Sequence, residues 1–276
     1  MIHIEHFTFN AFQTRCCVVW DETGKCAIID PGCATEEEFS QITSLIAKHG
    51  LEPECIMLTH AHFDHIYGMS ALAKEYEIPV YADMDEMYTL EMTNPAVCKA
   101  YGLPLPDTFP MIKSISEASI NSRFYQVSRF DTIQVGNLRF EVIETPGHSR
   151  GGLCFFERTE RVLFTGDTLF AGAIGRTDHP GGDYDALMKS IFENLLPLEN
   201  ADGSGSAQGS AQGSAQGSAQ GSAQDSAQGS ADGSAQGSAQ ARGSIQVIPG
   251  HGPCSDLTTE AMTNPFLLPF NEPYEG

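Results

Sequence analysis

A seven-residue run, Thr59-His-Ala-His-Phe-Asp-His65, limits the possible folds of this chain more than any other segment. It places three imidazoles and one carboxylate within six consecutive positions. The apolar residues 55–58 before it are typical of a buried strand, and residues 70–77 after it are typical of a helix, so the run occupies a turn between the two. Because imidazole nitrogen and carboxylate oxygen suit zinc and similar divalent cations, the run indicates part of a metal site.

An ordinary polar turn at the start of a helix is the simpler alternative. It would explain Asp64 as a residue that caps the helix. It would leave His60, His62 and His65 without a role, so we prefer the metal site.

Three later segments repeat one pattern, in which a short apolar strand ends at a potential metal ligand beside a glycine. The ligands are His148 after residues 140–147, Asp167 after residues 162–166 and His251 after residues 245–250. Any one of these segments alone is more often an ordinary loop. Together with the run at 59–65, however, four strand ends present His or Asp, and we predict that they meet at one site.

Local patterns elsewhere predict an α+β fold that opens with antiparallel strands. Strands are predicted at 2–10, 15–20, 26–30, 78–82, 132–135, 138–145, 153–157, 162–165 and 245–248. Helices are predicted at 35–49, with Thr35 as N-cap and Gly50 as the stop, and at 70–77 and 183–196. The proline-containing stretch 84–128 is predicted to form helices and loops over the core.

Residues 203–244 repeat the tetrapeptide Gly-Ser-Ala-Gln, with rare Asp substitutions. The repeat has no aromatic or branched apolar residue with which to bury a core, so we predict that it is disordered. The chain of 276 residues is then one domain, 1–276, which the repeat at 203–244 interrupts.

Charge and cysteine content exclude several classes of function. The formal net charge is -21, with 36 acidic and 15 basic side chains, which argues against binding to nucleic acid or to an anionic membrane. No segment has the length and apolar character of a membrane span or a signal peptide. The eight cysteines have irregular spacings, which favours reduced thiols and a cytoplasmic protein.

Through the four motifs above, the chain closely resembles the metallo-beta-lactamase superfamily. The resemblance implies a four-layer αββα sandwich with two divalent metal ions at one edge, zinc first and iron or manganese as alternatives. By motif position, the first metal's ligands would be His60, His62 and His148, and the second metal's ligands would be Asp64, His65 and His251. Asp167 would bridge the two metals, and Asp64 and Asp167 are the residues to which we assign a catalytic role.

The local resemblance is to short, single-domain members of the glyoxalase-II-like group, through the segment from Asp167 to Arg176. This implies a binuclear hydrolase that uses a metal-bound hydroxide on a small-molecule thioester similar to hydroxyacyl-glutathione. Arg176 would bind the anionic glutathione part, or alternatively would pair with Asp178 and fix its loop. For the nearby His179 we predict a position on a surface loop, with a position behind the metal ligands as the alternative.

Three other functions remain as alternatives. A mononuclear non-haem iron persulfide dioxygenase resembles this chain at His60, His148 and Asp167, although Gly252-Pro253 after the last histidine favours a hydrolase. Lactonases and phosphodiesterases of the superfamily share the metal ligands. A metal-binding module without catalytic activity is the fourth class.

Overall fold

The structure is a computed structural model that describes residues 1–107, 124–126, 131–200 and 243–268. The chain divides into two compact units, one made of Met1–Glu199 and Ser244–Gly276 and the other of Asn200–Gly243. The two sheets and the candidate site lie in the first unit. Residues 203–242 of the repeat predicted to be disordered, and residues 108–123 and 127–128 of the stretch 84–128, fall outside the described residues. In the described part of 84–128 helices occur as predicted, but residues 124–126 form a strand that was not predicted. The single interrupted domain stays a prediction.

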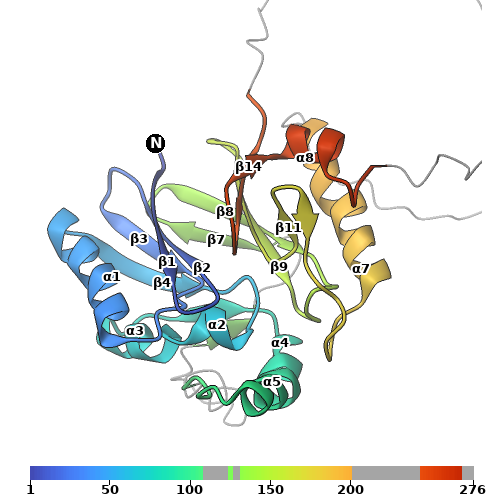
Figure 1. The fold of residues 1–276 in the computed structure, drawn as a ribbon. Helices are drawn as coiled ribbons and strands as arrows, with labels where there is room; N and C mark the ends of the chain where they lie inside the picture. Colours follow the sequence, from blue (N-terminus) through green and yellow to red (C-terminus); the bar gives the residue numbers. More distant parts are fainter. Residues whose placement is uncertain (108–123, 127–130, 201–242, 269–276) are drawn as a thin grey trace, which may run out of the picture. The chain divides into compact units, whose positions relative to one another are not determined.

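The first sheet has six strands in the order β1-β2-β3-β4-β5-β6. They are β1 (His3–Phe9), β2 (Thr14–Trp20), β3 (Lys25–Ile29), β4 (Glu52–Met57), β5 (Val80–Ala82) and β6 (Phe124–Gln126). The strands β1, β2 and β3 are antiparallel, as the sequence predicted, whereas β3 to β6 are parallel. The carboxyl ends of β3 and β4 therefore meet at one edge of the sheet (Figure 1).

The second sheet also has six strands, in the order β14-β13-β10-β9-β8-β7. They are β7 (Thr132–Val135), β8 (Leu138–Glu144), β9 (Leu153–Glu157), β10 (Val162–Gly166), β13 (Gln246–Pro249) and β14 (Ser255–Asp256). Because β10 and β13 are parallel, their carboxyl ends lie side by side. A separate short pair follows β10, formed by β11 (Leu169–Phe170) and β12 (Ala173–Ile174).

Helices occur at the three places where they were predicted, and the one predicted at 183–196 continues from an α-helix into a π-helix. The helices of the described residues are α1 (Glu36–His49), α2 (Phe63–Ile66), α3 (Met69–Glu75), α4 (Glu86–Tyr88), the π-helix η1 (Thr89–Thr93), α5 (Asn94–Tyr101), α7 (Tyr184–Lys189), the π-helix η2 (Ser190–Leu195), the 3-10 helix η3 (Leu196–Asn200) and α8 (Leu257–Thr263). Thr35 caps α1 in a capping box with Glu38, and Gly50 ends it in the left-handed conformation, as predicted. None of the helices in the described part of the chain combines the length and apolar character needed to span a bilayer.

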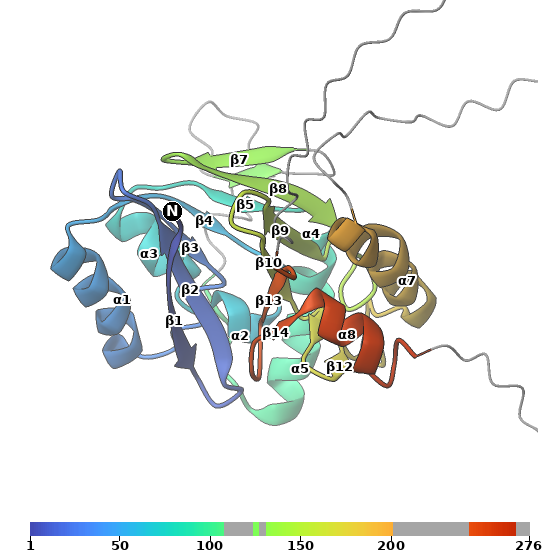
Figure 2. The same ribbon diagram turned by 90° about the horizontal axis from the view of Figure 1, so that it is seen from above.

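The buried side chains form three layers between four layers of secondary structure. Side chains alternate along each strand, so Cys16 and Val18 of β2 pack with the residues of α1 and α3, whereas Cys17 and Val19 pack against the second sheet. A third cluster lies between the second sheet and α7 and α8. The helices α1 and α7 accordingly lie on opposite outer faces (Figure 2). The order of layers confirms the predicted αββα sandwich.

Backbone hydrogen bonds join the two sheets directly at the edge where the predicted ligands lie. The amide of Leu153 in the second sheet donates to the Thr59 carbonyl (2.7 Å), and the amide of Arg15 in the first sheet donates to the Gly250 carbonyl (2.7 Å). The strand ends that carry His60, Asp167 and His251 are therefore held in fixed relation to one another.

Candidate metal centre

The run at 59–65 follows β4 and ends inside the short helix α2. His62 is the N-cap of α2 in an extended conformation, and its side chain makes no capping bond. Asp64 lies within α2 and not at its N-cap, so the simpler alternative, in which Asp64 caps the helix, does not hold. Its Oδ2 instead accepts a hydrogen bond from the Thr14 hydroxyl (2.7 Å) and faces the rings of His65 and His251.

The first group of potential ligands is His60, His62 and His148, whose ligand atoms all lie within 4.8 Å of one another. His148 Nε2 is 2.9 Å from His62 Nδ1. All three residues are buried. The buried Nε2 of His60 has no hydrogen-bond partner among the residues that the structure describes. A buried polar atom without a partner is costly, so its position indicates a missing ligand.

The second group is Asp64, His65 and His251, which also lie within 4.8 Å of one another. His65 Nε2 is 3.2 Å from His251 Nε2. Asp64 Oδ2 is 3.6 Å from His65 Nε2 and 3.5 Å from His251 Nε2. His65 is fully buried, whereas the side chain of His251 is partly exposed, so solvent reaches the site from the His251 side.

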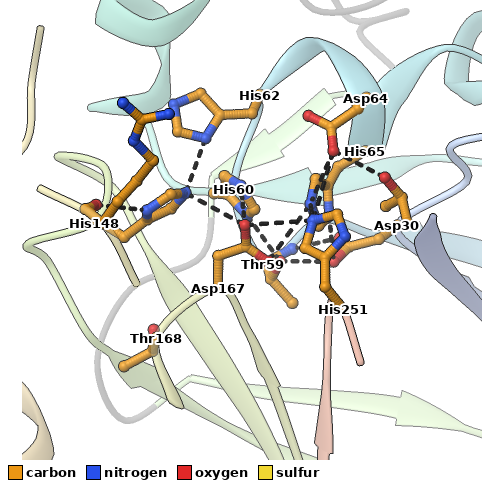
Figure 3. Close-up of polar contacts among 12 residues, drawn as sticks. Asp30, Thr59, His60, His62, Asp64, His65, His148, Asp167, Thr168 and His251 are labelled. Atoms are coloured by element: carbon orange, nitrogen blue, oxygen red, sulfur yellow. Dashed lines mark hydrogen bonds and ion pairs between the residues drawn. The ribbon is translucent and has the colours of Figure 1, made fainter. Parts of the chain in front are cut away.

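Asp167 lies between the two groups (Figure 3). Its Oδ2 is 3.4 Å from both His148 Nε2 and His251 Nε2, and 4.0 Å from His60 Nε2. Its Oδ1 is 3.5 Å from His65 Nε2 and, within the described ranges, accepts no hydrogen bond. The structure thus brings all seven predicted ligand residues together.

The distances within this cluster fit divalent cations. Ligand atoms about 2.0–2.2 Å from a single cation lie roughly 3–4 Å from one another, and the separations here run from 2.9 to 4.0 Å. Nitrogen and oxygen donors of this kind suit zinc, iron and manganese. Two of the buried side-chain atoms without a hydrogen-bond partner in the described part of the chain, His60 Nε2 and Asp167 Oδ1, belong to this cluster. They and the donor set therefore fit the metals that the sequence implies.

In four of the five histidines of the cluster, the ring nitrogen that faces away from the other ligands has a partner that fixes the ring. The contacts are His60 Nδ1 with the Thr59 hydroxyl (3.0 Å), His65 Nδ1 with Asp30 Oδ2 (3.1 Å), His148 Nδ1 with the Arg176 carbonyl (2.8 Å) and His251 Nδ1 with the Phe12 carbonyl (3.0 Å). A histidine anchored in this way presents its other nitrogen to a metal in a set tautomer and orientation.

The charges and the burial of the cluster favour the binding of a cation. Burial, with the neighbouring imidazoles, lowers the pKa of His60 and of His62 well below the usual range. Burial also acts to lower the pKa of His65, but the carboxylates of Asp64 and Asp167 outweigh it and raise that pKa well above its usual value. Two carboxylates thus retain a proton on one imidazole, and a divalent cation is the other way to balance their charge.

Asp30 belongs to the site although the sequence analysis did not select it. Its Oδ1 accepts from the Thr59 amide (2.8 Å), and its Oδ2 accepts from the Thr59 hydroxyl (2.6 Å) and contacts His65. These bonds fix the start of the run and the ring of His65. A signal was present, because Asp30 directly follows the apolar strand β3 and lies beside Pro31-Gly32, although at His148 and His251 the Pro-Gly pair comes before the ligand.

Two glycines allow the backbone to approach the cluster. A Cβ added to Gly250 would lie 2.4 Å from Asp167 Oδ1, and one added to Gly175 would lie 1.9 Å from the Asp167 carbonyl oxygen. Since atoms cannot approach so closely, only glycine fits at these positions.

Arg176 and His179 lie on the loop beside the first group. The guanidinium of Arg176 donates to both oxygens of Asp178 (2.7 and 3.0 Å), and both side chains are exposed. This is the ion pair that the sequence allowed. The ring centroid of His179 lies 4.8 Å from that of His62 and 5.0 Å from that of His148. The half-buried ring thus packs against two of the predicted ligands, which favours the alternative position behind the ligands over the preferred surface loop.

Known proteins share this fold and this sequence pattern. The profile of the metallo-beta-lactamase superfamily matches residues 9–202. The hydroxyacylglutathione hydrolase GloC of Haemophilus influenzae is 33% identical over 199 residues, which cover 72% of this chain and 87% of that protein. The crystal structure of the B3 metallo-beta-lactamase BLEG-1 has a TM-score of 0.70 and 26% identity, and covers 97% of this chain and 100% of its own. A di-iron-bound form of TTHA1623 has a TM-score of 0.65 and 27% identity, with coverage of 95% and 100%.

Proposed function

The chain belongs to the metallo-beta-lactamase superfamily, and from this we propose that it is a binuclear metal hydrolase that cleaves a thioester of the hydroxyacyl-glutathione type. The observation that supports two metals is the pair of complete ligand groups with Asp167 between them. Members of the superfamily are hydrolases that hold divalent metals at such His and Asp clusters. The chain is therefore a metal-dependent hydrolase, and we propose a thioester as its substrate.

Each ligand has a role that follows from its contacts. We propose that His60, His62 and His148 hold one cation and that Asp64, His65 and His251 hold the other. Asp167 is the bridge because its Oδ1 faces His65 of the second group and its Oδ2 faces both His148 and His251. Two cations bound in this way would acidify a water between them and polarise the carbonyl of the substrate.

The thioester follows from the similarity to the GloC hydrolase of Haemophilus influenzae, whose name specifies hydroxyacylglutathione. The eight cysteines all lie in the described ranges, and none forms a disulfide. A reducing compartment such as the cytoplasm, where glutathione conjugates also occur, is therefore the proposed location.

A direct test measures metal content and activity on one preparation. We expect about two equivalents of zinc, iron or manganese per chain and hydrolysis of S-lactoylglutathione or of a simple acyl thioester. A lactone and glutathione persulfide are assayed as well, because they are the substrates expected for the lactonase and dioxygenase alternatives. Protein that holds metal but hydrolyses no thioester would refute the proposal.

Arg176 is the proposed anion-binding residue for the carrier part of the substrate. We expect Arg176→Gln to raise KM for S-lactoylglutathione roughly fivefold with kcat nearly unchanged, because an exposed Arg–carboxylate pair contributes about 1 kcal/mol. Arg158→Gln is the matched control, since Arg158 makes the same two-bond contact with Glu141 (2.6 Å each) on another part of the surface. Equal KM values for both variants would show that Arg176 only fixes its loop through Asp178.

An iron persulfide dioxygenase is the second candidate, and one observation favours it. His60, His148 and Asp167 alone form a set of two histidines and one carboxylate, with Asp167 Oδ2 3.4 Å from His148 Nε2 and 4.0 Å from His60 Nε2. TTHA1623, which is 27% identical, was crystallised with two irons. Oxygen uptake with glutathione persulfide would establish this activity. The complete second ligand group favours the hydrolase.

A further inference from the structure

Glu86 is a fully buried carboxylate that the proposed chemistry does not use. Its Oε2 accepts a hydrogen bond from the Ala61 amide (2.7 Å), and its Oε1 accepts one from the Gly151 amide (2.9 Å). Ala61 lies between the proposed ligands His60 and His62, and Gly151 lies three residues after His148. One side chain thus links the two chain segments that supply the first group.

Asn94 completes this link from the same helical segment. Its Nδ2 donates to the Ala61 carbonyl (2.8 Å), and its Oδ1 accepts from the Phe63 amide (3.1 Å). The amide of Ala61 is therefore held by Glu86 and its carbonyl by Asn94. Backbone groups on both sides of His62 are fixed from outside the site.

A π turn places Glu86 and Asn94 on one face of their helix. The two residues are eight positions apart, and in a regular α-helix they would point about 80° away from each other. The π-helix η1, Thr89–Thr93, lies between them. Because a π turn takes up about one residue more than an α turn, one turn of each kind spans roughly eight residues and brings the two side chains into line.

The backbone contact at Gly151 shows how closely the segments meet. A Cβ on Gly151 would lie 2.8 Å from the Glu86 amide nitrogen and 2.9 Å from the Asp83 side chain. Burial raises the pKa of Glu86, and hydrogen bonds such as those from the amides of Ala61 and Gly151 act against this rise. Burying a carboxylate costs free energy unless hydrogen bonds compensate for the lost water. The contribution of Glu86 therefore depends on its hydrogen bonds to the two amides and not on apolar packing.

The second ligand group is anchored by other residues. The Asp64 carbonyl accepts from Asn10 Nδ2 (2.9 Å) and its carboxylate accepts from Thr14 (2.7 Å), while His65 contacts Asp30 (3.1 Å). These partners come from the first sheet or from the turns beside it and do not include Glu86. The two groups share the contact of Asp30 with Thr59 and His65, but the contacts of Glu86 are with the segments that supply the first group.

We propose that Glu86 is a positioning residue that sets the affinity of the first metal site, formed by His60, His62 and His148, and leaves the second site nearly unaffected. The inference rests on the metal centre of the proposed function. With Glu86 in place, the two ligand segments are held together before a metal binds. Without Glu86, part of the binding free energy of the metal is used to order these segments, so the affinity is lower.

The variant Glu86→Gln tests this inference because it keeps the shape of the side chain. Its amide group retains one acceptor, and its NH2 would face one of the two backbone N–H groups. Metal-free protein is titrated with Zn²⁺ in the presence of a competing chelator, and His148→Ala and His251→Ala identify which binding step belongs to which site. We expect affinity at the first site to fall about ten- to a hundredfold, the range usual for loss of a group that orients metal ligands, and affinity at the second site to change less than about threefold.

Glu157→Gln is the matched control. Glu157 is another buried glutamate, and it accepts a backbone bond from the Glu160 amide (2.7 Å) at the far end of β9 from the site. We expect both of its metal affinities to equal those of the natural protein. If Glu86→Gln does not fold, Glu86→Asp, which keeps the charge but is too short to reach both amides, should show the same selective loss.

Three outcomes separate the possibilities. A selective loss at the first site supports the inference. An equal loss at both sites, or a lower melting temperature with unchanged affinities, shows that Glu86 has only a structural role and overturns it. If the natural protein binds two metals but cleaves no thioester, the proposed function fails, and the selectivity of Glu86→Gln still decides the inference.

Discussion

Asp167→Asn is expected to lower kcat/KM for thioester hydrolysis on the order of a thousandfold. The carboxylate faces both ligand groups, with Oδ2 3.4 Å from His148 Nε2 and Oδ1 3.5 Å from His65 Nε2. The amide removes the negative charge between two proposed cations and turns an NH2 group toward one set of imidazoles. Steady-state kinetics and metal content, measured on the same sample, give the size of the effect and its cause.

The matched control for this variant is Asp21→Asn. Asp21 is another buried aspartate, and it accepts bonds from the amides of Thr23 (2.9 Å) and Asn137 (2.7 Å). We expect Asp21→Asn to lower the melting temperature but to change kcat/KM by less than about twofold, since surface turns contribute to stability and not to the chemistry. Should Asp167→Asn retain more than about a tenth of the activity, the assignment of Asp167 as the bridge is wrong.

The sequence was sufficient to predict the seven clustered residues because each follows a short apolar strand. Strands of this kind are buried, and their ends point to one edge of a sandwich, so His148, Asp167 and His251 could be placed together before any coordinates were known. The alternation of Cys16, Cys17, Val18 and Val19 between two cores could not be predicted in the same way. All four residues are apolar, and only the pairing of two sheets shows which face each one occupies.

The residues that hold the ligand segments in place, Glu86 and Asn94, were harder to predict than the ligands. Glu86 lies in a short helix with Met and Tyr beside it, and no local pattern distinguishes its carboxylate from a solvent-exposed one. Its burial follows from the approach of Gly151 and Ala61, which are distant in sequence. The π turn that aligns it with Asn94 likewise depends on tertiary contacts, since the residues of η1 show no propensity that would identify it.

Removal of the metals is expected to destabilise the fold strongly. A ligand present at about a thousandfold excess over its Kd adds about 4 kcal/mol to the free energy of unfolding, and two such sites add about twice that. For a domain of this size we expect chelation to lower Tm by on the order of 10 °C or more. Differential scanning calorimetry with and without chelator measures the difference, and restoration of Tm by added Zn²⁺ is the control for irreversible damage.

The difference in Tm between metal-bound and metal-free protein should narrow as the pH falls from 7.5 to 5.5. Metal binding requires unprotonated imidazoles. In the metal-free protein, the carboxylates of Asp64 and Asp167 overcome the effect of burial and raise the pKa of His65 and of His251. Such a raised pKa stabilises the metal-free fold below the pKa of the unfolded chain, near 6.5, and this contribution is lost as the pH rises through the folded pKa.

Protons and metal ions therefore compete for the ring nitrogens of His65 and His251, and protonation is favoured increasingly as the pH falls. The shifts at His60 and His62 act differently, because burial keeps these two rings neutral and holds them ready for a metal. Competition between protons and metal should thus mainly affect the second group. We therefore expect the second metal to be released first on acidification. A Tm difference that does not change with pH, or simultaneous release of both metals in a titration followed by metal analysis, would contradict this division between the two groups.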